Sequence, residues 1–115
     1  MLKRLLVLML LLSGPALAQG VSKVSVRDQN SELVKTLTSA RDLAAFEALW
    51  SAKTVREPAS RSEFIYKIVV ERGGRSVSWL YDPAGFVQVL SVSRTPVYEV
   101  SDPQAFNRLL AIEPQ

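Results

Sequence analysis

Two glycine-containing turns place the strongest constraint on how this chain can fold. Gly73-Gly74 suits a two-residue type I′ turn, in which both central residues need a positive φ angle. The segment 82–85, Asp-Pro-Ala-Gly, suits a three-residue loop, because proline presets the first turn residue and glycine tolerates a left-handed position. Apolar and polar residues alternate around both turns. The region 63–100 is therefore predicted to form a four-stranded antiparallel meander.

Counting outward from the two turns gives the register of the first three strands. The predicted pairs are Val70 with Val77, Ile68 with Trp79, Tyr66 with Tyr81, Tyr81 with Val87, and Trp79 with Val89. Both turns independently place Trp79 and Tyr81 on the same face of the sheet. The last strand, at about 96–100, adds Tyr98 and Val100 to this face if Val92 pairs with Val97.

Helical spacing recurs in two further segments. Ser39 and Asp42 resemble a capping box, and the apolar residues that follow predict a helix from about Ala40 to Lys53. Its apolar stripe consists of Leu43, Phe46, Leu49 and Trp50. Asp102-Pro103 begins a terminal helix of about nine residues, because aspartate caps helices and proline suits their first position. Its apolar residues are Phe106, Leu109 and Leu110.

These elements together predict an α+β fold. A short N-terminal strand around Val24 and Val26 precedes one amphipathic helix that packs on the four-stranded antiparallel meander, and a short C-terminal helix closes the chain. The segment 54–62 has no periodicity and is predicted to be a surface loop. The arrangement resembles cystatin-like curved sheets, a resemblance of architecture that implies no function.

The N-terminus has the order of a secretory signal peptide. Two basic residues precede an apolar run from Leu5 to Leu12, and small residues stand at Ala16 and Ala18. The run is shorter than the roughly 20 residues that span a bilayer, so we expect cleavage after Ala18 and no stable membrane anchor. Residues 1–18 are then the signal peptide and residues 19–115 one small domain. A cysteine-free exported chain of this size indicates a bacterial periplasmic or secreted protein.

The composition excludes several chemistries. Histidine and cysteine are both absent, which removes imidazole bases, thiol chemistry, disulfides and the usual zinc ligands. The carboxylates are scattered, so no catalytic, cofactor-binding or metal-ligating residue is predicted. Once Lys3 and Arg4 leave with the signal, 12 basic residues (14 − 2) stand against 11 acidic ones without forming a basic block. Nucleic acid is therefore not an expected partner.

The sheet face away from the long helix carries a predicted apolar strip. The strip consists of Leu80, Phe86, Leu90, Val92 and Val97. Contiguous apolar surface marks contact sites, so we expect the strip to be covered by the terminal helix or by a second chain. That second chain is either a homodimer partner or another envelope protein. Trp79 and Tyr81, which we assign mainly to the core, form an alternative ligand platform.

The segment from Asp42 through the turn motif Trp-Leu-Tyr-Asp-Pro-x-Gly (79–85) to Phe106-Asn107-Arg108-Leu109-Leu110 resembles short exported bacterial proteins of unknown function. The shared positions are the helix stripe, the aromatic strand and the turn. All of these serve folding, so the resemblance implies no activity and no catalytic residue.

Three hypotheses for function remain from the sequence. The first is a non-enzymatic periplasmic or secreted binding or accessory protein that acts by protein–protein contact. The second is a carrier of a small ligand or lipid, with a pocket between helix and sheet, which a filled interface would exclude. The third is an enzyme that uses carboxylates or a lysine, for which clustered carboxylates with raised pKa values in a cleft are required.

Overall fold

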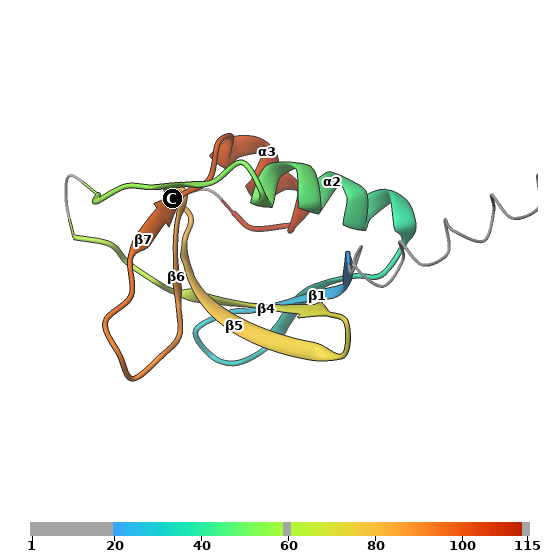
Figure 1. Ribbon diagram of the computed structural model, residues 1–115, viewed down its shortest axis with the longest axis horizontal. Helices are drawn as coiled ribbons and strands as arrows, with labels where there is room; N and C mark the ends of the chain where they lie inside the picture. The colour runs from blue at the N-terminus through green and yellow to red at the C-terminus, as the bar shows by residue number, and fades with distance from the viewer. Residues whose placement is uncertain (1–19, 59–60, 114–115) are drawn as a thin grey trace, which may run out of the picture.

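The structure, a computed structural model, describes residues 20–58 and 61–113. In these residues two helices lie on one face of a seven-stranded antiparallel sheet (Figure 1). The elements are β1 (Val21–Arg27), β2 (Leu33–Leu37), α2 (Ala40–Trp50), β3 (Thr54–Val55), β4 (Tyr66–Arg72), β5 (Arg75–Asp82), β6 (Phe86–Val89), β7 (Val97–Glu99) and α3 (Pro103–Leu109). The strands lie in the order β2-β1-β4-β5-β6-β7-β3. The predicted α+β class and antiparallel sheet are confirmed, whereas the predicted signal peptide lies outside the described residues.

The two turns fold as the sequence predicts. Gly73 and Gly74 have φ angles of 56° and 80°, and Gly85 has a φ angle of 114°, so all three adopt conformations that favour glycine. The predicted pairs between β4 and β5 and between β5 and β6 are all observed, including Trp79 with both Ile68 and Val89. Turn chemistry alone therefore fixes the register at the centre of the sheet.

The predicted register of the last strand is wrong. Val97 pairs with Gln88 instead of Val92, a shift of four positions (92 − 88) along β6. The segment 90–96 forms a wide loop, closed by a hydrogen bond of 2.7 Å from Gln88 Nε2 to the carbonyl oxygen of Thr95. Because the shift is an even number of residues, Tyr98 and Val100 still face the helices.

Two further strands extend the sheet beyond the predicted meander. The predicted N-terminal strand is observed as β1. β2 pairs with it, and Leu37 lies opposite Val24. The turn between them is closed by Asp28, whose carboxylate accepts two backbone N–H groups. β3 lies in the segment 54–62, which was expected to be loop only, and Val55 pairs with Tyr98 of β7. A two-residue strand is too short to show alternation in the sequence.

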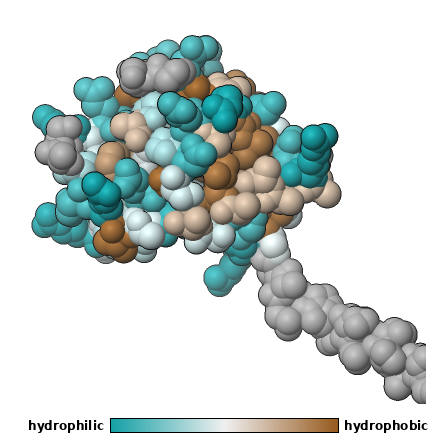
Figure 2. Space-filling model, turned by 90° about the horizontal axis from the view of Figure 1, so that it is seen from above, coloured by the Kyte–Doolittle hydropathy of each residue, from teal (hydrophilic) through white to brown (hydrophobic). Residues whose placement is uncertain are grey.

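Helix α2 begins where it is predicted and ends earlier. Ser39 Oγ accepts the N–H of Asp42 at 3.1 Å, so the N-cap is confirmed. The helix ends at Trp50 instead of Lys53. Its outer surface exposes four alanines, Ala40, Ala44, Ala45 and Ala48, and apolar side chains gather on this side of the molecule (Figure 2). Alanine is the best helix former, which suits positions that no core contact decides.

Helix α3 packs beside α2 on the same face of the sheet. The ring centroid of Phe106 lies 5.7 Å from that of Phe46 and 5.2 Å from that of Tyr81. Leu110 is fully buried. The expectation that α3 covers the apolar strip is therefore wrong. The physical reason is the width of the sheet. Helix α2 alone cannot cover one face of seven strands, so the apolar residues of α3 pack beside it on the same face. The buried apolar side chains are Val21, Val24, Val26, Leu37, Phe46, Trp50, Ile68, Val70, Tyr81, Val87, Val100, Phe106, Leu110 and Ile112.

Candidate functional site

Three of the five strip residues lie together on the sheet face opposite the helices. Leu80 of β5 and Val97 of β7 flank Gln88, which pairs with both, and Phe86 lies two residues before Gln88 on β6. The side chains of Leu80, Phe86 and Val97 are each half-buried. The structure thus retains a short apolar strip, interrupted at its centre by the amide of Gln88.

The other two strip residues lie in the loop 90–96 instead of a strand. Leu90 is 49% exposed and Val92 is fully exposed. Figure 1 shows this loop extending away from the helices. Hydrogen bonds hold it, with the N–H of Ser93 donating to Ser91 Oγ at 3.1 Å and Gln88 holding its far end. Val92 is therefore exposed to solvent on a loop that these hydrogen bonds link to β6.

Tyr81 cannot serve as a ligand platform because its side chain is fully buried. Its hydroxyl donates to Asn107 Oδ1, and Asn107 Nδ2 in turn donates to the carbonyl oxygen of Pro83 at 3.0 Å. Burial, aided by the charge of Asp82, raises the pKa of the Tyr81 phenol. These contacts link the second turn to α3, so the role of Tyr81 is structural.

Trp79 is half-buried and belongs to an aromatic cluster at the C-terminal end of α2. Its ring centroid lies 4.8 Å from that of Trp50, in an edge-on arrangement, and 6.0 Å from that of Tyr98. The ammonium of Lys53 lies 4.2 Å from the Trp50 ring centroid and 5.1 Å from that of Trp79. Such cation–π contacts are attractive. Burial and the nearby charge of Arg72 lower the pKa of Lys53, and Glu47 opposes this shift.

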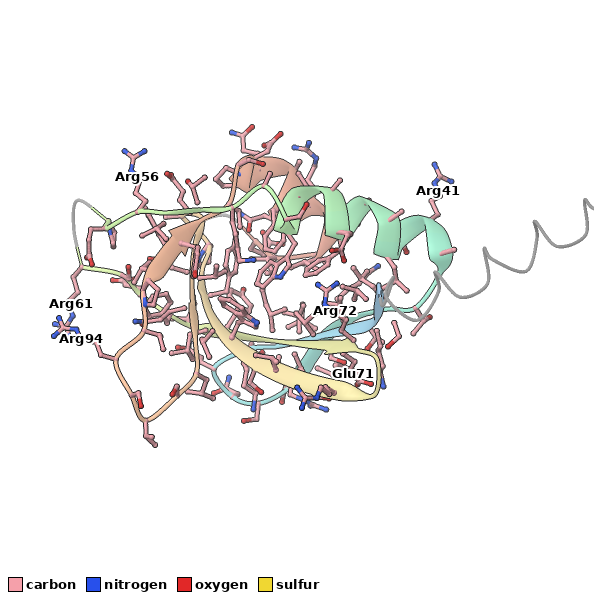
Figure 3. The ribbon with its side chains drawn as sticks, viewed as in Figure 1. Arg41, Arg56, Arg61, Glu71, Arg72 and Arg94 are labelled. Carbon is pink, nitrogen blue, oxygen red and sulfur yellow. The ribbon has the colours of Figure 1, made fainter. Side chains whose placement is uncertain are left out.

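A pocket of about 270 Å³ opens beside this cluster, between α2 and the hairpin of β4 and β5. Its lining residues are Trp50, Val70, Arg72, Arg75, Val77 and Trp79. Figure 3 shows the Arg72 side chain in the layer between α2 and the sheet. Arg72 Nη1 lies 3.3 Å from Glu47 Oε2, while Glu47 Oε1 is buried without a hydrogen-bond partner in the described part of the chain. The helix–sheet interface is thus filled around Phe46 and open at this end.

Of the residues that line this pocket, Trp79 was predicted from the sequence as a candidate ligand contact, whereas the charged residues were not. Arg72 and Arg75 flank Gly73-Gly74 symmetrically, so the type I′ register already pairs them across the hairpin. They share the helix-facing side with Val70 and Val77. The two arginines were therefore predictable from the turn, whereas the approach of Lys53 depends on where α2 ends.

Comparisons with models of protein families, with curated proteins and with solved structures found no match to this chain. Within residues 20–58 and 61–113, no three acidic side chains lie close enough together to hold a metal ion. No helix in the same residues is long and apolar enough to cross a membrane.

Proposed function

We propose that this chain is a non-enzymatic binding protein of the bacterial periplasm that acts by contact with a second protein. The supporting observation is the position of Val92, which is fully exposed on the loop that joins β6 to β7, the strands that carry the half-buried Phe86 and Val97. Because both helices lie on the opposite face, no helix of the described chain covers this surface (Figure 1). The compartment follows from the predicted signal peptide.

In this proposal the apolar side chains of the loop 90–96 provide binding free energy, and its charged side chain selects the partner. Burying a leucine or a valine side chain contributes about 1.5–3 kcal/mol, and a loop held by hydrogen bonds loses less conformational entropy on binding than a free one. Arg94, on the same loop, is exposed. We therefore expect a partner with an apolar pocket for Val92 and an acidic side chain near Arg94. Mixed charges elsewhere on this sheet face, such as Lys67 and Glu99, confine the apolar contact to the strip.

The test is site-specific photocrosslinking in cells that export the chain. A photoreactive residue at position 92 is expected to give one adduct of defined mass, larger than this chain and different from twice its mass. The double variant Leu90→Ser with Arg94→Glu should reduce the adduct about tenfold or more, since each tenfold corresponds to about 1.4 kcal/mol. A photoreactive residue at Leu33, which is 54% exposed on the edge strand β2, is the matched control.

The outcomes separate the alternatives. No adduct from position 92, or the same adduct from position 33, contradicts contact through this loop. An adduct of twice the chain mass also contradicts the proposal, because the occupant would then be a second copy of this chain.

A further inference from the structure

The pocket beside α2 contains an unfavourable pair of like charges. Arg72 and Arg75 are direct partners across the end of the β4–β5 hairpin, and both line the pocket on the helix side. Like charges placed opposite each other on neighbouring strands repel. Glu47 pairs with Arg72 at 3.3 Å, whereas no carboxylate of the described residues forms an ion pair with Arg75. Lys53 adds a further positive charge near Arg72.

The remaining walls of the pocket are apolar. Trp50 lines the pocket from α2, and Trp79, the buried Val70 and the 43% exposed Val77 line it from the β4–β5 hairpin. A volume of about 270 Å³ lies just below the range of roughly 300–1,000 Å³ that holds drug-sized ligands. The pocket therefore suits a molecule with one or two rings and one charged group.

We propose that this pocket binds a small aromatic carboxylate, whose carboxylate pairs with Arg75 and whose ring system packs against Trp79 and Val77. Guanidinium and carboxylate groups match in planar, two-point geometry, and the anion relieves the repulsion between Arg75 and Arg72. A cation is disfavoured by the same side chains, and a neutral ring leaves Arg75 without a counter-charge, whereas Arg72 already pairs with Glu47. The pocket lies on the helix side, so this binding is independent of the contact through the loop 90–96.

The two tryptophans of the chain both line the pocket, which gives the test a local readout. The signal-free chain, residues 19–115, is titrated with 2-naphthoate and, separately, with the neutral 2-naphthamide, while NMR follows the indole N–H signals of Trp50 and Trp79. We expect 2-naphthoate to shift these signals with saturation and to bind about tenfold or more tightly than the amide, because charged hydrogen bonds are the stronger ones.

Two substitutions sharpen the test. Arg75→Gln keeps a polar side chain at an exposed position, so the fold is retained, and we expect it to weaken 2-naphthoate binding about tenfold. Arg41→Gln is the control, because Arg41 lies at the far end of α2 and points away from the pocket (Figure 3). Equal binding of acid and amide, unchanged binding by Arg75→Gln, an equal loss in both variants, or no movement of the indole signals would each overturn the proposal.

Discussion

Replacing Phe46 with alanine is expected to lower the free energy of unfolding by about 3–5 kcal/mol. Phe46 is fully buried, and its ring lies 5.1 Å from that of Trp50 and 5.7 Å from that of Phe106. Its removal leaves a cavity where both helices meet the sheet, and the surrounding rings are too rigid to fill it. Domains of ordinary stability have only about 5–15 kcal/mol in total, so the variant retains little of it.

Chemical denaturation of the signal-free chain measures this loss. Leu33→Ala is the matched control, because Leu33 is 54% exposed on the edge strand β2. We expect the control to lose less than about 1 kcal/mol. If Phe46→Ala costs no more than Leu33→Ala, Phe46 does not occupy the centre of the core and the placement of α2 is wrong.

Replacing Gly85 with alanine is expected to lower the free energy of unfolding by about 2–5 kcal/mol. Two physical terms add, since a positive φ angle costs an L-residue about 1–2 kcal/mol and overpacking costs about 1–3 kcal/mol more. Gly85 has a φ angle of 114°, and an added Cβ would lie 2.6 Å from Pro103 Cγ at the start of α3. The turn and the helix would have to move apart.

Gly74→Ala isolates the first of these terms. Gly74 also has a positive φ angle, 80°, yet an added Cβ meets nothing within 4 Å. We expect this variant to lose only about 1–2 kcal/mol in the same denaturation experiment. Equal losses for the two glycines would mean that Pro103 does not pack on Gly85, and the docking of α3 against the second turn would have to be revised.

The central hairpins were predictable because their turns are chemically specific. Gly73-Gly74 and the Asp-Pro-Ala-Gly segment each permit few backbone conformations, and both agree on the face that carries Trp79 and Tyr81. The segment 90–96 offers no such constraint. Its serines and Pro96 allow loops of several lengths, so the register of β7 depends on contacts such as that between Gln88 and Thr95. Only tertiary structure selects among them.

The candidate-site residues, too, were predictable only where a specific turn sets the register of the strands. Leu80, Phe86 and Val97 share a face because alternation survives an even shift in register, whereas Leu90 and Val92 lie in the loop beyond the end of β6. The pairing of Arg72 with Arg75 follows directly from the two-residue turn at Gly73-Gly74. The pocket is also lined by Trp50 of α2. The sequence contains no local pattern that predicts the packing of α2 and α3 on the same face of the sheet.

The sheet face opposite the helices must be open for the proposed contact. NMR of the signal-free chain with a soluble paramagnetic agent measures this openness directly, because the agent broadens only methyl signals that it can approach. We predict strong broadening for Val92, clear broadening for Leu80 and Val97, and none for the fully buried Val87 and Leu110. Protection of Leu80 and Val97 equal to that of Val87 would contradict an open face.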